Sequence, residues 1–152
     1  MFTRTQLILG HEGMQRLRNI RVIIFGIGGV GSWCAESLVR TGVENVTLVD
    51  SDVICASNIN RQLHATRETV GRVKVDVMKE RLLSINSNAK IEVIHKFYDI
   101  QTAEEFPLEQ YDVIIDAIDS TDSKILLMER ASSLADKGVL FLSAMGAALK
   151  ID

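Results

Sequence analysis

Four glycines lie close together near the start of the chain, in the run from Gly26 to Gly31 (G-I-G-G-V-G). The run follows an apolar stretch with strand character and opens a stretch with helical spacing, which is the context that a phosphate-binding turn requires. Glycines there let backbone N–H groups approach a phosphate, and the helix N-terminus adds a partial positive charge. Asp50, at the end of the next strand-like run, is placed to bind ribose hydroxyls. Gly26, Gly28, Gly29, Gly31 and Asp50 therefore predict a nucleotide site; a glycine turn that only shapes the backbone is the alternative.

The glycine turn alone favours NAD or FAD, and the loop that follows Asp50 moves the prediction to ATP. A triphosphate carries more charge than a pyrophosphate bridge and normally needs side-chain cations. Arg61 and Lys74 supply two cations, and Asn58 adds a hydrogen-bond donor. We also assign Asp52, in the same loop, to nucleotide binding. A solvated surface charge is the ordinary interpretation of an arbitrary Arg or Lys, but the joint placement of these two after the turn favours a phosphate site.

Asp119 extends the predicted site to a metal ion. It ends the run Asp116–Asp119 (D-A-I-D), which closes a fourth strand-like stretch. In a doubly wound sheet the ligand lies outside the carboxyl ends of the strands, so the loop after the second strand and the tip of the fourth converge on one crevice. Mg²⁺ accompanies nucleotide triphosphates and takes carboxylate and phosphate oxygens. We therefore predict that Asp119 holds Mg²⁺ with ATP, and that Lys74 and Asp119 both lie in an exposed crevice.

Five strand-like runs alternate with helical patterns, and this alternation defines the fold that positions these residues. The runs are mostly short and apolar, as expected for strands buried on both faces. The expected strands are Arg21–Phe25, Asn45–Asp50, Ile91–His95, Tyr111–Asp116 and Val139–Ser143. The expected helices are Glu12–Arg18, Val30–Arg40, Val75–Ile85 and Ser120–Lys137, with Gly42 and Gly138 as helix ends and Pro107 in a connection. The pattern predicts an α/β fold: a Rossmann-like, doubly wound, mainly parallel sheet with helices on both faces.

Composition limits the size, compartment and partners of the protein. The 152 residues, 47% of them hydrophobic, suit one domain over residues 1–152, and the last run (G-A-A-L-K-I-D) suggests that the domain continues in a longer parent protein. The net charge of −3 provides no broad basic field for nucleic acid, and Arg67, Arg72, Lys90 and Lys96 form no cluster. The first twenty residues carry charges and no continuous apolar core, so neither a signal peptide nor a membrane anchor is expected. We predict a cytoplasmic protein.

The two cysteines, Cys34 and Cys55, form no C-x-x-C pair. Neither a disulfide framework nor a structural zinc site is therefore predicted in this stretch. Cys55 lies in the loop on the nucleotide side, where a buried or half-buried thiol is preferred over a catalytic one. Trp33 and His64 are interpreted as packing and loop residues.

Five runs, in order along nearly the whole chain, resemble the ThiF/MoeB/ubiquitin-activating superfamily. They are G-I-G-G-V-G-S-W, L-V-D-S-D, S-N-I-N-R-Q, V-G-x-x-K and I-D-A-I-D-S. The resemblance implies that Asp50 binds the ATP ribose and that Asp119 organises the magnesium. It also implies that Asn58, Arg61 and Lys74 hold the phosphates.

Arg4, in the run F-T-R-T-Q, resembles an arginine that in this superfamily reaches across a dimer interface to the partner's ATP. A solvated N-terminal arginine is the alternative. The same segment carries apolar residues that one small sheet would not bury, namely Leu7, Ile8, Leu9 and Met14. We therefore expect a homodimer in which Arg4 acts in trans.

Within the superfamily, three runs most resemble the tRNA threonylcarbamoyladenosine dehydratases. They are G-S-W-C-A-E-S-L-V-R-T-G, N-I-N-R-Q-L-H-A-T and S-A-M-G-A-A-L-K-I-D. The resemblance implies that the carboxylate of a threonylcarbamoyl group on tRNA attacks the α-phosphate of ATP and releases pyrophosphate. The adenylate then closes into a ring with loss of AMP, so no protein nucleophile is needed. Partners from a cysteine-desulfurase pathway are also implied by this resemblance.

Three alternatives remain open from the sequence. The first is adenylation of the C-terminal glycine of a ubiquitin-like sulfur-carrier protein for molybdopterin or thiamine synthesis, by enzymes that often carry a zinc site and a catalytic cysteine further along the chain. The second is an NAD-binding module or oxidoreductase, which leaves Asn58, Arg61 and Lys74 without a role. The third is a domain that binds ATP or dimerises without catalysis. We expect the 152-residue form to bind ATP and to handle tRNA poorly.

Overall fold

A five-stranded parallel sheet with the order β3-β2-β1-β4-β5 forms the centre of the computed structural model, which describes residues 1–145. Every neighbouring pair of strands is parallel. The strands are β1 (Arg21–Phe25), β2 (Asn45–Val49), β3 (Lys90–Ile94), β4 (Val113–Asp116) and β5 (Leu140–Ser143). The chain adds strands outward from β1 to β3 and then crosses back to β4, so the strand order reverses between β1 and β4. The predicted doubly wound, parallel α/β fold is confirmed.

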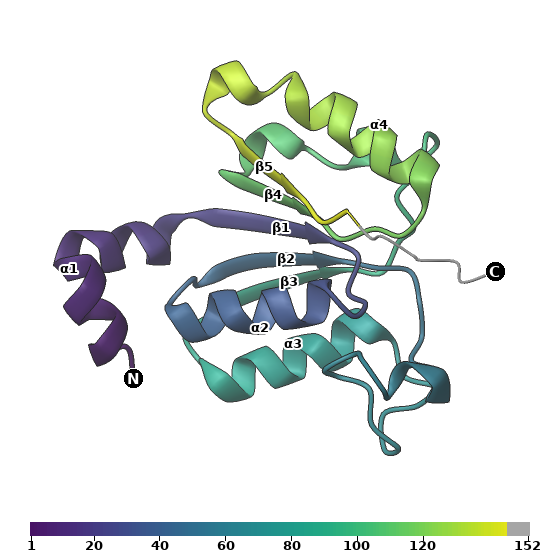
Figure 1. Cartoon of the computed structure of the whole chain (residues 1–152), viewed down its shortest axis with the longest axis horizontal. Coiled ribbons are helices and arrows are strands. Elements are labelled where there is room, and N and C mark those ends of the chain that lie inside the picture. Colours follow the sequence, from purple (N-terminus) through teal and green to yellow (C-terminus); the bar gives the residue numbers. More distant parts are fainter. Residues whose placement is uncertain (146–152) are drawn as a thin grey trace.

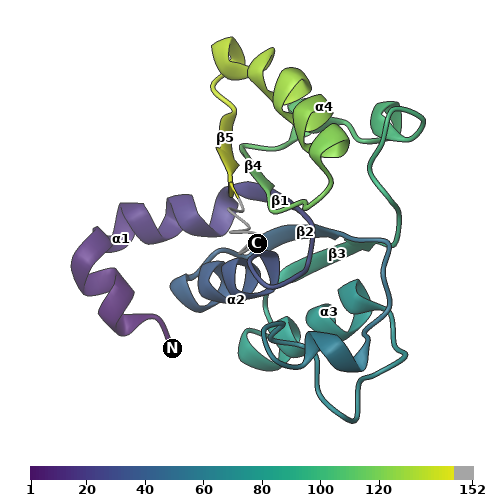
Figure 2. The ribbon, with the colours of Figure 1, turned by 45° about the vertical axis from the view of Figure 1, so that its right-hand side comes forward.

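Helices cover both faces of the sheet (Figure 1). The α-helices are α1 (Thr3–Asn19), α2 (Gly31–Thr41), α3 (Lys74–Ile85) and α4 (Thr121–Ser132). Short 3-10 turns are η1 (Ala56–Asn58), η2 (Ala103–Glu105), η3 (Leu108–Gln110) and η4 (Ala135–Lys137). Figures 1 and 2 show α2 and α3 together on one face and α4 on the other. No helix in the described part of the chain is long and apolar enough to span a membrane.

Alternate residues of each central strand point to opposite faces, and this period separates two cores. Val22 and Ile24 of β1 belong to the core under α2 and α3. Ile23 and Phe25 belong to the core under α4. In that second core, Phe25 meets Tyr98 edge to face with ring centroids 4.9 Å apart. The central strands are therefore buried on both sides, as their apolar runs predict.

The N-terminal helix is longer than predicted and is broken in the middle. Helix α1 begins at Thr3 rather than Glu12, and Gly10, with φ of 69°, interrupts it. Glycine tolerates this backbone at little cost, so two helical pieces meet there at an angle (Figure 2). The apolar run Leu7–Leu9 does not repeat at the helical spacing that marks a core-facing side. The sequence pattern therefore did not reveal the helical piece before Gly10.

Other element ends differ from prediction by smaller amounts. The helix expected to reach Lys137 ends at Ser132, and η4 with Gly138 at φ of 79° completes the connection. The expected residues Asp50 and His95 fall just beyond β2 and β3, because strand pairing stops before them. The final run of the chain, residues 146–152, lies outside the described residues.

Candidate nucleotide-binding site

The glycine turn lies at the carboxyl end of β1, where the strand order reverses. Gly26 has φ of 89°, and a Cβ there would lie 2.5 Å from the carbonyl oxygen of Ala117, just beyond β4. A Cβ on Gly31 would lie 1.8 Å from the carbonyl oxygen of Gly26. Packing therefore requires glycine at both positions. A Cβ on Gly28 or Gly29 would meet nothing closer than 3.4 Å, so these two glycines leave the outer side of the backbone open.

The open side of this turn presents unpaired backbone donors. The amides of Gly28, Gly29 and Val30 donate no hydrogen bond to any residue in the range 1–145. The first turn of α2 follows them directly, and the amide of Ser32 donates to the carbonyl of Gly28 at 3.1 Å. Free N–H groups at a helix N-terminus bind anions such as phosphate. The turn can therefore hold a phosphate group.

Asp50 lies beside the turn, as its place after β2 predicts, and it also fixes the turn. Its Oδ2 accepts a hydrogen bond from the amide of Ile27 at 2.7 Å. Its Oδ1 accepts one from the amide of Asp52 at 2.8 Å. A carboxylate has about four acceptor positions, so two remain for ligand hydroxyl groups. Asp50 is only partly buried, so these positions are accessible.

The long loop over residues 51–73 carries the predicted polar residues and is closed at its base. Val53 pairs with Val73 in an isolated antiparallel bridge, and the amide of Ile54 donates to the carbonyl of Arg72 at 2.8 Å. Asn58 is buried within the loop, where its Oδ1 accepts the amide of Cys55 at 3.0 Å. Its side-chain Nδ2 has no partner among residues 1–145. Asn58 thus combines a local structural bond with a side-chain NH2 group that is free to donate.

Arg61 lies directly against the glycine turn. Its Cγ would be 3.4 Å from a Cβ on Gly29, and its Nη1 donates to the carbonyl of Ser57 at 3.1 Å and to Oδ1 of Asn60 at 3.0 Å. The residue is exposed, and its Nε and Nη2 have no partner in the described part of the chain. These groups are available to a ligand at the turn.

Lys74 is buried, which corrects the prediction of an exposed position. It is the first residue of α3, only 5% of it is exposed, and its Nζ donates to Oδ2 of Asp52 at 2.8 Å. Asp52, which we assigned to nucleotide binding, is the counter-ion of this lysine and remains exposed. Hydrogen bonds therefore run from Ile27 through Asp50 and Asp52 to Lys74, and link the lysine to the turn.

The tip of β4 carries one exposed and one buried carboxylate. Asp119 is exposed and has no hydrogen-bond or ion-pair partner among residues 1–145. Asp116 is fully buried, and Lys124 of α4 donates to its Oδ2 at 2.7 Å. Ser143 Oγ donates to the same oxygen at 2.7 Å, and Asp116 Oδ1 accepts the amide of Ile118 at 3.0 Å. Asp116 is therefore committed to the fold, whereas Asp119 is available to a cation.

The described residues contain no cluster of three or more His, Cys, Asp or Glu side chains that could hold a metal ion. Mg²⁺ is usually bound by one or two carboxylates together with substrate phosphates. A single available carboxylate at Asp119 fits that mode, and does not fit a cage made by protein groups alone.

Arg4 does not join the site of its own chain. Figures 1 and 2 show α1 at the end of the sheet where the strands begin, whereas the glycine turn lies where β1 ends. Arg4 is exposed and makes no hydrogen bond or ion pair with residues 1–145.

Two interpretations made from the sequence are wrong, and one is confirmed. Cys55 is exposed rather than buried, because the loop turns it outward at the start of η1. Trp33 is 55% exposed rather than packed, and its Nε1 donates to the carbonyl of Arg61 at 3.1 Å. His64 is buried as a packing residue, and burial, followed by Lys74 and Arg81, lowers its pKa to about 4.

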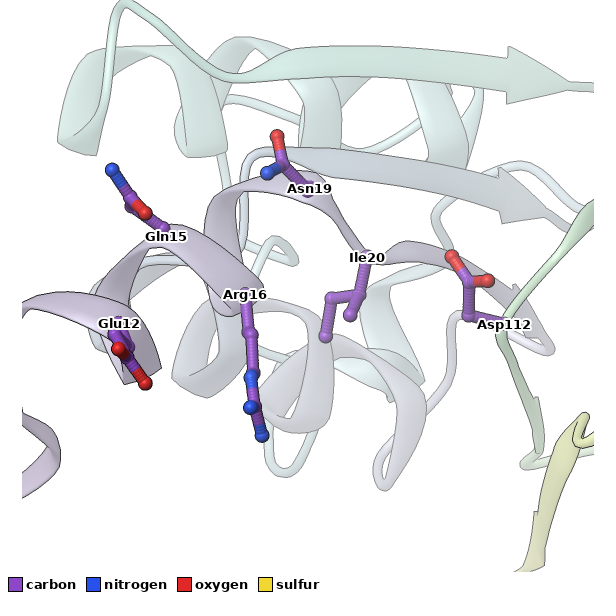
Figure 3. Close-up of a pocket in the computed structure, with 6 residues that line it drawn as sticks. All are labelled: Glu12, Gln15, Arg16, Asn19, Ile20 and Asp112. Atoms are coloured by element: carbon purple, nitrogen blue, oxygen red, sulfur yellow. The ribbon is translucent and has the colours of Figure 1, made fainter.

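An open pocket of about 640 Å³, to which mostly polar residues contribute, lies away from this site (Figure 3). Its walls come from α1, from Ile20 and from Asp112, at the end of the sheet where the strands begin. It contains none of the predicted site residues. A second groove of about 490 Å³ includes Phe97, Ile100 and Ser120, close in sequence to Asp119.

Sequence reasoning missed the groups that hold the site together. Ser32 and Trp33 bond to the loop that carries Arg61, and Lys124 neutralises Asp116. The two bonds to the loop join positions 31 and 28 residues apart, and Lys124 lies eight residues after Asp116 on a different element, so no local spacing indicates these pairs. The apolar patterns that predict the strands carry no information on such pairs.

The sheet order and the glycine turn define a Rossmann-like α/β domain. The model of the ThiF family matches residues 3–150, and the chain belongs to this family. The chain is 42% identical over 151 residues to the tRNA threonylcarbamoyladenosine dehydratase of Bacillus subtilis, covering 99% of this chain and 58% of the relative. It is 34% identical over 142 residues to a sulfur carrier protein adenylyltransferase of Thermus thermophilus, covering 90% of this chain and 51% of the relative.

A solved structure supports the same relationship. The crystal structure of the Escherichia coli tRNA N6-threonylcarbamoyladenosine dehydratase in complex with ATP superposes with a TM-score of 0.89 at 36% identity. The match covers 99% of this chain and 61% of that one. The chain thus spans about half to three fifths of the length of these relatives.

Proposed function

We propose that this chain is the ATP-binding part of an enzyme that adenylates a carboxylate, namely the threonylcarbamoyl group of tRNA threonylcarbamoyladenosine. The observation that carries the proposal is the open glycine turn with Arg61 against it, next to a strand-end carboxylate, Asp50. The similarity to a dehydratase solved with ATP, over 99% of this chain, supports the choice of ATP over NAD.

The chain's own residues have separate roles in this reaction. The amides of Gly28, Gly29 and Val30 and the guanidinium of Arg61 bind phosphate oxygens, and Asp50 accepts hydrogen bonds from the ribose. Asn58 and Lys74 add donors from the loop and from the start of α3. The cations Arg61 and Lys74 stabilise the negative charge that grows on the phosphate oxygens, and all these donors hold the nucleotide in line with the attacking carboxylate. Asp52 keeps Lys74 oriented, and contacts the nucleotide less directly.

The bonds made and broken balance without a protein nucleophile. A carboxylate oxygen of the threonylcarbamoyl group forms a bond to the α-phosphorus while the bond to pyrophosphate breaks. A nitrogen or oxygen of the carbamoyl group then attacks the acyl carbon, AMP leaves, and one proton is released. The net change in the nucleoside is the loss of one water.

Mg²⁺ would be held by Asp119 together with the phosphates. When bound, it neutralises charge on the triphosphate and favours the departure of pyrophosphate. The exposure of Asp119 and its freedom from other partners within residues 1–145 support this assignment.

A second candidate substrate is the C-terminal glycine of a ubiquitin-like sulfur carrier. The similarity to the Thermus thermophilus sulfur carrier protein adenylyltransferase favours it, because the match covers 90% of this chain. The first step would use the same residues, since both substrates present a carboxylate to the α-phosphate.

One incubation separates the two substrates. The longer protein of which this chain is proposed to be the ATP-binding part is mixed with ATP, Mg²⁺ and either threonylcarbamoyl-modified tRNA or a sulfur-carrier protein, with the Bacillus subtilis relative as the positive control. We expect AMP and a tRNA nucleoside lighter by one water, detected by mass spectrometry. A carrier-protein adenylate with unmodified tRNA would contradict the tRNA proposal and leave the ATP chemistry standing.

We also propose a cytoplasmic homodimer in which Arg4 completes the partner's site. Leu7 and Ile8 on α1 are 82% and 83% exposed, which is apolar surface that a second chain would cover. Mixing Arg4→Ala subunits with Lys74→Ala subunits should restore part of the activity, because one site of the heterodimer then has both cations. A monomer that is active without Arg4 would contradict this arrangement.

A further inference from the structure

Two neighbouring side chains at the start of α2 hold the loop that carries Arg61. Ser32 is buried; its Oγ donates to the carbonyl of Gly28 at 2.6 Å and accepts the amide of Leu63 at 3.2 Å. Trp33 donates from Nε1 to the carbonyl of Arg61 at 3.1 Å. These bonds fix the backbone on both sides of Gln62 to the glycine turn.

The position of the Arg61 guanidinium depends on that backbone. Its aliphatic part lies against Gly29, and its Nη1 is held by Ser57 and Asn60 of the same loop. Every contact that directs Arg61 towards the turn therefore comes from the loop or from the first turn of α2. A shift of the loop would move the guanidinium away from the open glycines.

Burial does not explain why position 33 carries a tryptophan. Trp33 is 55% exposed, so most of its large ring gains little by removal from water. Its specific contribution is one N–H directed at the carbonyl of Arg61, a bond that a phenylalanine of similar shape could not make. A tryptophan with no role beyond general packing would not need this bond.

We propose that Trp33, together with Ser32, is a positioning residue that holds Arg61 over the glycine turn. The inference rests on the proposed function, because it requires a nucleotide phosphate at the turn. Trp33 acts through Arg61 and does not contact the phosphate itself. Loss of its N–H should therefore weaken nucleotide binding only while Arg61 is present.

The test is a double-mutant cycle on the dissociation constant for ATP with Mg²⁺. Calorimetry is the method of choice, because Trp33 is the only tryptophan and its fluorescence is lost in Trp33→Phe and in the double variant. We expect Arg61→Ala to weaken binding about 10- to 100-fold, as for a charge-assisted bond. Trp33→Phe should weaken it about three- to tenfold. The double variant should be within about twofold of Arg61→Ala alone.

Ser37→Ala is the matched control, because Ser37 is exposed on the same helix and its side chain has no hydrogen bond among residues 1–145. Its affinity should equal that of the wild type. As a second measurement, the amides of Arg61 and Leu63 should exchange with deuterium faster in Trp33→Phe than in the wild type, without ligand.

The outcomes separate this inference from the proposed function. Additive losses in the double variant, or an unchanged affinity in Trp33→Phe, would overturn the positioning role and leave ATP binding intact. A wild-type protein that does not bind ATP would overturn the proposed function, and this inference with it.

Discussion

Two lysine–aspartate pairs lie at the carboxyl ends of the strands, on opposite sides of β1, and they differ in exposure. In the pair at the end of β4, the side chains of Lys124 and Asp116 are 13% and 0% exposed. In the pair beyond β2, the side chain of Lys74 is 6% exposed, but that of Asp52 is 63% exposed. One pair is closed to solvent, and the other is open on its acidic side.

The polar groups around each pair show the same difference. Lys124 also donates to the carbonyl of Ala144 at 3.0 Å, and Ser143 donates to Asp116, so the β4 side has its hydrogen bonds satisfied. The β1–β2 side keeps free amides at the glycine turn and free donors on Arg61. We propose that the β1–β2 side is arranged for a ligand and that the Lys124–Asp116 pair stabilises the fold. Asp119 lies beyond β4 but is exposed and belongs with the open side.

The largest effect is expected on the closed side. Lys124→Met should lower the free energy of unfolding by about 3–5 kcal/mol, because it leaves Asp116 as a buried charge without a partner. Urea denaturation measures the change. Adding Asp116→Asn to this variant removes the charge and keeps an acceptor for the amide of Ile118, so part of the loss should be recovered. A loss below about 1 kcal/mol in Lys124→Met would show that the two pairs do not differ as described.

The open side should show the opposite behaviour, with activity lost and stability kept. Lys74→Met and Asp119→Asn should each reduce ATP-dependent pyrophosphate release about 100-fold or more, as expected for groups that stabilise transition-state charge. Unfolding free energies should change by about 1 kcal/mol or less, because Asp52 stays solvated when its lysine is removed. Lys137→Met, at an exposed position in η4, is the control. Wild-type rates in the two site variants would remove both residues from the site.

His64 gives the open side a pH dependence. Its pKa of about 4 lies below the ordinary value of 6.5, through burial and then through Lys74 and Arg81. The unfolded chain therefore binds the proton more readily, and the stability present above pH 6.5 is lost as the pH falls towards 4. The loss amounts to roughly 3 kcal/mol. His64→Gln should remove this part of the slope in urea titrations at several pH values, whereas His11→Gln, at an exposed position, should not. Equal slopes in all three proteins would contradict the assignment.

The sequence predicts the sheet well, because a strand buried on two faces needs a continuous apolar run and a parallel crossover needs a helix. It also locates the turn, since Gly26 has a positive φ and a Cβ on Gly31 would meet the nearby carbonyl oxygen of Gly26. It fails for Lys74, whose burial depends on a partner twenty-two positions away. It fails likewise for Trp33, because exposure depends on what the fold places beside a residue, and composition does not reveal that.

The first helical piece of α1 shows a different limit. Its run Leu7–Leu9 stays exposed in a single chain, so no core-facing period marks it as a helix. The proposed role of Arg4 likewise depends on a second chain. The resemblance to the superfamily suggested this role, which residue spacing within one chain does not indicate.

The thermal stability of the protein with ATP and with NAD tests the central claim most directly. A ligand that binds only the folded state stabilises it by about 2.7 kcal/mol at 100 times its dissociation constant. With equal concentrations of the two nucleotides, we predict that ATP with Mg²⁺ raises the melting temperature by several degrees and that NAD changes it little. Stabilisation by NAD, without an effect of ATP, would contradict the assignment of the glycine turn and its loop to ATP.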